Sequence, residues 1–150
     1  MKISDILKHK GSNVWTLQAP QTVDEALQLF VTHHIGALVV LDENNKQIVG
    51  VISERDIVRG CYYKHSKLDN TLVRDLMTEK VITCSPDDPI DGIMAMMTNH
   101  RVRHIPVLVE GRLQGIVSIG DVVKALLEDS AHQIQNLKEY MYGSNPGPIE

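Results

Sequence analysis

The chain has 150 residues, of which 43% are hydrophobic, 23% charged and 4% aromatic, and its formal net charge is −4. This length suits one ordinary domain or a compact pair of half-size repeats, and the composition is that of a globular protein with an aliphatic interior. The acidic balance argues against a broad surface that neutralises phosphates, so we expect no nucleic-acid partner.

The first residues of the chain bear on its cellular location. Asp5, Lys8 and Lys10 leave no room for the apolar stretch of a secretory signal. No uninterrupted apolar run approaches the ~20 residues that a membrane-spanning helix needs. Cys61 and Cys84 are far apart and form no C-x-x-C motif, which favours two reduced thiols. We therefore expect a cytoplasmic protein with no membrane partner.

The next residues predict a strand, a helix and a hairpin. A short strand around Thr16 precedes a helix that opens with a capping box, Thr22 to Glu25. Residues 37–41 and 48–52 are short β-rich runs on either side of a polar turn. Another helix follows the second run. The apolar stripe of the first helix is expected to be Val23, Ala26, Leu27, Phe30 and Val31.

The second half of the chain predicts the same order of elements. A strand around Thr83 precedes a helix that opens at Asp88 and Pro89, and strands follow at 105–109 and 113–117. The apolar stripe of this helix is expected to be Ile90, Ile93, Met94 and Met97.

The last predicted helix begins near Gly120 and runs through Met141, and a stretch rich in glycine and proline at 143–148 should end it. Its later turns extend beyond the part that has a counterpart in the first half. The apolar side chains of Ile134 and Leu137 therefore need a partner there, which favours a homodimer.

The two halves are copies of one another. Gly50, Ser53 and Asp56 recur 65 positions later, at Gly115, Ser118 and Asp121. Further upstream the offset is 67, because the hairpin turn of the second copy is two residues shorter. The residues repeated at that larger offset are Val14, Thr16, Asp24, His33, Val40, Leu41 and Glu43.

The repeat also sets the expected domain organisation. A half-domain of this size cannot hide its own sheet face, so two three-stranded sheets should pack through a pseudo-two-fold axis. The first repeat is assigned to residues 1–68 and the second to 69–130. Residues 131–150 are expected to form a helix extension and a flexible tail.

Segments 50–58 and 115–123 carry a family resemblance. They read GVISERDIV and GIVSIGDVV, which is similar to the signature of the cystathionine-β-synthase (CBS) domain. Residues 101–107 read RVRHIPV, and this string with the two signatures resembles small stand-alone proteins of bacteria and plant organelles. The resemblance implies an α/β fold in which two β-α-β-β-α repeats pack as a CBS pair, or Bateman module.

The resemblance implies a nucleotide site in each repeat. Asp56 and Asp121 stand at helix starts, where a carboxylate can accept hydrogen bonds from both ribose hydroxyls. The same helix starts suit a phosphate, with Ser53, Arg55 and Ser118 placed to contribute. The alternative is that these serines and aspartates only cap their helices.

The base would lie against the second strand of each repeat, at Gly36, Ala37 and Leu38 in the first and at His104, Ile105 and Pro106 in the second. In the first repeat Gly36 and Ala37 leave room for a flat ring. Pro106 removes a ladder donor, so its strand should be an edge or be bent there. Thr16 and Thr83 are polar contacts to the base or simply β-formers.

Charge should make the two sites unequal. Arg101, Arg103 and His104 place positive charge at the mouth of the site or form an ordinary basic turn. The second signature has Ile119 and Gly120 where the first has Glu54 and Arg55, so the second pocket has no adjacent cation of its own. We expect it to borrow charge from the two arginines.

The predicted function is regulatory. The chain has no nucleophile elbow, phosphate-binding loop or zinc-protease motif, so we expect no catalytic residues. His33, His34 and His100 lack a third ligand at metal-binding spacing, and we assign no metal. The module should sense AMP, ADP, ATP or NAD and modulate a client protein. The alternatives are a ligand-free interaction or dimerisation protein and an S-adenosylmethionine binder.

Overall fold

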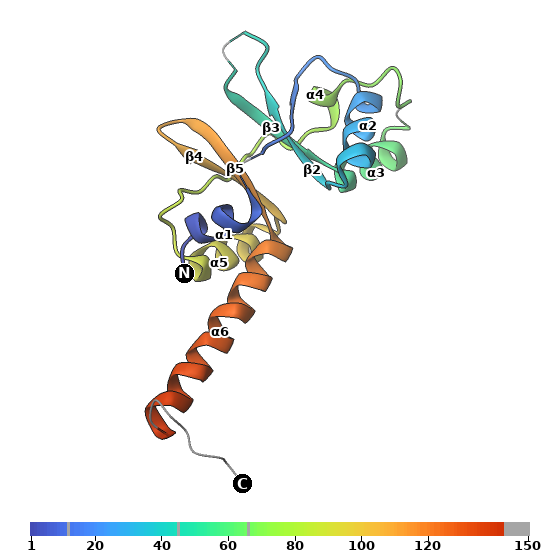
Figure 1. Cartoon of the computed structure of the whole chain (residues 1–150). Coiled ribbons are helices and arrows are strands. Elements are labelled where there is room, and N and C mark those ends of the chain that lie inside the picture. The colour runs from blue at the N-terminus through green and yellow to red at the C-terminus, as the bar shows by residue number, and fades with distance from the viewer. Residues whose placement is uncertain (12, 45, 66, 143–150) are drawn as a thin grey trace.

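The computed structural model describes residues 1–11, 13–44, 46–65 and 67–142 (Figure 1). The predicted stop signals at 143–148 lie outside these residues. The elements in chain order are α1 (Ile3–Lys10), β1 (Thr16–Gln18), α2 (Val23–His33), β2 (Ala37–Leu41), β3 (Ile48–Ser53), α3 (Glu54–Tyr63), α4 (Val73–Leu76), α5 (Ile90–His100), β4 (His104–Val109), β5 (Arg112–Ser118) and α6 (Ile119–Tyr142).

The first repeat, β1 to α3, contains the predicted three-stranded sheet. Strand β1 pairs in parallel with β2, and β2 pairs antiparallel with β3. Helix α2 opens with the predicted capping box: the backbone N–H of Glu25 donates to Oγ1 of Thr22 (3.2 Å), and the N–H of Thr22 donates to Glu25 (3.0 Å). The predicted place of Val31 on the buried stripe is wrong. Its side chain is 74% exposed because it lies at the edge of the stripe, ~80° around the helix from Val23.

The second repeat, α5 to α6, differs from the expected three-stranded sheet. Its sheet has only β4 and β5, and the residues before α5 contribute one bridge, from Cys84 to Val107. A parallel ladder would continue with a bond from the N–H of residue 106 to the carbonyl of Ile82. Pro106 has no N–H, so the ladder stops on that side. On the other side the next bond would need the N–H of residue 86, which is also a proline, so the ladder is limited to one bridge.

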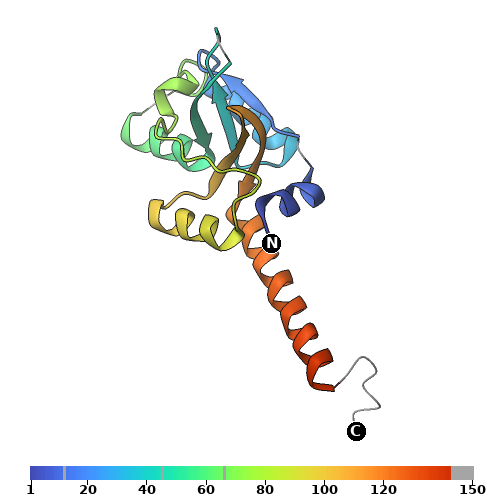
Figure 2. The ribbon, with the colours of Figure 1, turned by 90° about the vertical axis from the view of Figure 1, so that its left-hand side faces the viewer.

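Each repeat is completed by a helix from elsewhere in the chain. Helix α1, which precedes the first repeat, packs in the second, and helix α4, which precedes the second repeat, packs in the first. Ile3 and Ile6 of α1 are buried in the core of the second repeat, and Val73 and Leu76 of α4 are buried in the core of the first. Figures 1 and 2 show α1 beside the start of α6, and α4 beside α3. The two leading helices are therefore exchanged between the halves.

Helix α6 begins close to the predicted start, includes Met141 and extends away from the body of the protein (Figures 1 and 2). Its inner face contributes Val122 and Ala125 to the core of the second repeat. Every residue from 130 to 142 is exposed. Among the described residues, no helix is long and apolar enough to cross a membrane.

Candidate functional site

The two signature segments fold in the same way. In the first repeat, the N–H of Ser53 donates to Oδ2 of Asp56 (2.9 Å) and the N–H of Asp56 donates to Oγ of Ser53 (3.3 Å). The matching distances between Ser118 and Asp121 are 2.9 and 3.1 Å. The capping role considered from the sequence is therefore confirmed in both repeats. It leaves room for further bonds, because an ionised carboxylate offers about four acceptor positions.

The predicted base-binding segments lie beside these helix starts. Ala37 is opposite Ser53 in the first sheet, and His104 is opposite Ser118 in the second. The N–H of residue 54 donates to the carbonyl of Gly36 (3.1 Å), and the N–H of residue 119 donates in the same way to Arg103 (2.8 Å). The repeat therefore holds in three dimensions as well as in sequence.

The two halves approach each other near Gly36 and His104. A Cβ added to Gly36 would lie 3.9 Å from two atoms of the His104 ring. Burial lowers the pKa of His104, and the charge of Lys10 lowers it further, against the opposing effect of Asp121. His104 is thus mainly uncharged at neutral pH, where it presents a polar and uncharged ring to the other repeat.

The remaining candidates divide by exposure. The side chains of Leu38, Ile105 and Pro106 are buried in the sheets, so they support the strands rather than face solvent. Seven candidates are exposed: Thr16, Arg55, Thr83, Arg101, Arg103, Ile119 and Gly120. Arg101 directly follows α5 as its C-cap residue and has a left-handed backbone conformation.

A lysine missed by the sequence analysis lies in the second site. The Nζ of Lys10, at the end of α1, donates to Oδ2 of Asp121 (2.6 Å) and to the carbonyl of Ile116 (2.8 Å). Burial acts to raise the pKa of Asp121, but the hydrogen bonds from Lys10 and Ser118 outweigh it, and the pKa lies below its usual value. No local motif could have found Lys10, because it is 111 residues away from Asp121 in the chain.

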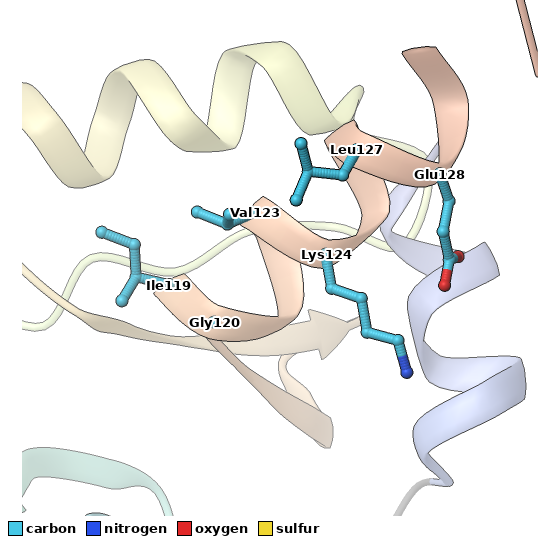
Figure 3. A pocket seen from close by; sticks show the side chains of 6 residues that line it. All are labelled: Ile119, Gly120, Val123, Lys124, Leu127 and Glu128. Atoms are coloured by element: carbon cyan, nitrogen blue, oxygen red, sulfur yellow. The ribbon is translucent and has the colours of Figure 1, made fainter. Parts of the chain in front are cut away.

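Two surface hollows flank α6. The larger, of about 520 Å³, runs along the helix beside Ile119, Val123 and Leu127, which point to one side of α6 while Lys124 and Glu128 point to the other (Figure 3). The smaller, of about 350 Å³, lies between α1 and α6 and is lined by both Lys10 and Asp121. The smaller hollow is therefore the one that opens next to the predicted ribose acceptor.

The histidines considered as metal ligands have other surroundings. The ring of His33 stacks on Trp15, with ring centroids 3.5 Å apart and planes at 13°. Within the described ranges, His, Cys, Asp and Glu side chains form no group of three that could hold a metal ion.

The sequence matches the CBS domain family twice, over residues 3–62 and 73–128. A mitochondrial CBS domain-containing protein of Arabidopsis thaliana, CBSX3, is 37% identical over 149 residues, which cover 94% of this chain and 72% of the relative. The crystal structure of the CBS-domain-containing protein ATU1752 from Agrobacterium tumefaciens is 38% identical with a TM-score of 0.78, covering 83% of this chain and 98% of that one.

A third similar protein has ligands bound. The CBS domain pair of MJ0100, in complex with 5′-methylthioadenosine and S-adenosylmethionine, is 25% identical with a TM-score of 0.75. The match covers 86% of this chain and 98% of that one.

Proposed function

This chain belongs to the CBS domain family, and we propose that it is a non-catalytic regulatory module that binds an adenosine-containing ligand in each repeat. The observation that carries the proposal is the matched Ser and Asp pair at the start of α3 and of α6, with the same hydrogen bonds in both. In this proposal Asp56 and Asp121 accept the ribose hydroxyls. The bound state of MJ0100 supports adenosine as the shared part of the ligand.

We favour AMP, ADP, ATP or NAD over neutral nucleosides, because each site has a candidate cation for a phosphate. Arg55 directly precedes Asp56 in α3, and Lys10 contacts Asp121. S-adenosylmethionine is the second candidate, supported by the ligands of MJ0100. The base would lie near Gly36 and His104, where the two halves approach each other.

The module would act by changing its contacts with a client protein when the ligand binds. We also propose that it is a homodimer, since the exposed apolar stripe of α6 matches a second copy of itself. A cytoplasmic location is part of the same proposal. Both cysteines are free, Cys61 on the surface and Cys84 inside, which is usual in a reducing compartment.

Calorimetric titration with AMP, ATP, NAD, S-adenosylmethionine and 5′-methylthioadenosine tests the proposed function. We expect the parent protein to bind at least one of these, and Asp56→Asn and Asp121→Asn each to lose one site, because the amide has lost the charge that strengthens the bonds to ribose. An asparagine oxygen can still accept the capping bond, so folding should be retained. If no compound released heat or raised the melting temperature, the ligand-free interaction protein would replace this proposal.

A further inference from the structure

The carboxylate of the first site has a neutral partner. The backbone N–H of Thr78, just after α4, donates to the carbonyl of Val51 (2.9 Å). The Thr78 hydroxyl donates to Oδ1 of Asp56 (3.2 Å). Two neutral donors therefore satisfy the carbonyl of the signature strand and the carboxylate that follows it.

In the second site a single charged group makes both of these bonds. Ile116 occupies the place that Val51 has in the first repeat, 65 residues earlier. The Nζ of Lys10 donates both to the Ile116 carbonyl (2.8 Å) and to Oδ2 of Asp121 (2.6 Å). The bonding is thus conserved between the two halves, but the second half adds a full positive charge.

We expect this ion pair to change when a ribose binds. Two ribose hydroxyls that bond to both oxygens of Asp121 need Oδ2, which already accepts from Lys10 and from the N–H of Ser118. The side chains of Lys10 and Asp121 are 36% and 24% exposed, and Lys10 also lines the hollow between α1 and α6. A four-carbon stem with three donors can turn its ammonium group towards this hollow without moving the backbone of α1.

The energetic consequence depends on the ligand charge. A neutral nucleoside that separates the pair leaves a partly desolvated ammonium group without a counter-charge, which is unfavourable. A nucleotide phosphate offers Lys10 a new charge-assisted hydrogen bond. Lys10 therefore keeps an anionic partner when a nucleotide binds and loses it when a neutral nucleoside binds, which favours the nucleotide.

We propose that Lys10 is the ligand-selecting cation of the second site: it pairs with Asp121 when the site is empty and with a phosphate of the ligand when the site is filled. This inference rests on the proposed function and names the residue that sets its charge preference. Gly120, which replaces the Arg55 of the first signature, therefore does not leave the second site without a cation.

Calorimetry with adenosine and AMP on the full chain tests the inference. An Asp56→Asn background confines binding to the second site. In this background we expect AMP to bind at least about tenfold more tightly than adenosine, which is the gain in affinity that one hydrogen bond to a charged group provides. Lys10→Met should bring the ratio close to one, by weakening AMP binding while adenosine affinity stays equal or rises. Lys8→Met removes the same charge from an exposed position on α1 and should leave the ratio unchanged.

The possible outcomes separate the two proposals. An unchanged ratio in Lys10→Met, or equal losses for both ligands, would overturn the role of Lys10 while the proposed function stands. If neither ligand bound to parent or variants, the proposed function and the inference would both be rejected. Adenosine binding by Lys10→Met alone would support the competition with Asp121. If the methionine variant failed to fold, Lys10→Gln, which retains N–H donors without the charge, should show the same loss of preference.

Discussion

At the scale of single residues, the signature glycines are explained by close packing. A Cβ on Gly50 would lie 2.5 Å from Sδ of Met77 and 3.0 Å from the carbonyl oxygen of Thr78. A Cβ on Gly115 would lie 2.7 Å from Cδ2 of Leu7. Each glycine therefore lets an exchanged segment lie directly against the signature strand.

Gly50→Ala should lower the free energy of unfolding by about 1–3 kcal/mol, because the Thr78 backbone cannot move aside freely. Gly115→Ala should cost less, since only the end of the flexible Leu7 side chain is in the way. Gly92→Ala is the control: its nearest neighbour would be 3.6 Å away, and alanine favours the helix. Urea denaturation measures all three, and equal stability of Gly50→Ala and the parent would contradict this account.

His104 should make stability depend on pH. Burial and the charges of Lys10 and Arg103 hold its pKa below 6.5, although Asp121 acts in the opposite direction. The unfolded chain therefore takes up the proton first as pH falls. The His104 contribution to the free energy of unfolding should be complete above pH 6.5 and decrease from there to the folded-state pKa. Urea denaturation of the parent protein and of His104→Gln between pH 7.5 and 5 isolates the contribution of His104. Parallel curves of unfolding free energy against pH would show that folding does not change the pKa of His104.

At the scale of elements, α6 has an exposed apolar stripe. Its spacing alternates between four and three residues, as in a helix that pairs with another helix, with Ser130 as the polar exception. The side chains of Ile134 and Leu137 are 56% and 58% exposed. The apolar members of the stripe are Val123, Leu127, Ile134, Leu137 and Met141. An isolated helical extension of this length is marginally stable in water, so the proposed pairing with a second copy would stabilise it.

Leu137→Glu should convert the proposed homodimer into a monomer, because it places a charge within the apolar stripe of both copies. Asn136→Glu adds the same charge one position away, off the stripe, and should leave the dimer intact. Sedimentation velocity at micromolar concentration measures both. A monomeric parent, or a Leu137→Glu variant of unchanged mass, would mean that another partner covers this face.

At the scale of the whole molecule, the exchanged leading helices couple the two halves. Ile3 is fully buried in the core of the second repeat, and Val73 is fully buried in that of the first. Separation of the halves would expose both cores. The molecule is therefore expected to unfold as one cooperative unit.

Ile3→Ala should lower the free energy of unfolding by about 2–5 kcal/mol, the range for a large buried aliphatic side chain. Trp15, the one tryptophan of the chain, lies just before β1 of the first repeat and reports on that half. Its fluorescence transition in urea should shift together with the far-UV circular dichroism, although the substitution is in the other core. A Trp15 transition that did not move would show that the repeats unfold independently.

The sequence by itself determined the features that depend on neighbours in the chain. The capping box at Thr22, the two signature helix starts and the start of α6 follow from spacing of a few residues, and the structure confirms them. The repeat also predicted that Ala37 and His104 would occupy matching places. One end of the short ladder between Cys84 and Val107 could also be predicted, since Pro106 lacks the N–H that would continue the ladder on that side.

Only the tertiary structure decided which segments complete each half. The spacing of apolar residues in α1 and α4 indicates which face each helix buries, but it does not indicate which of the two cores receives that face. Lys10 reaches Asp121 through that exchange, across 111 residues of sequence. Long-range partners of this kind are set by the packing of whole elements, whereas local hydrogen bonding and periodicity determine where an element begins and which face it buries.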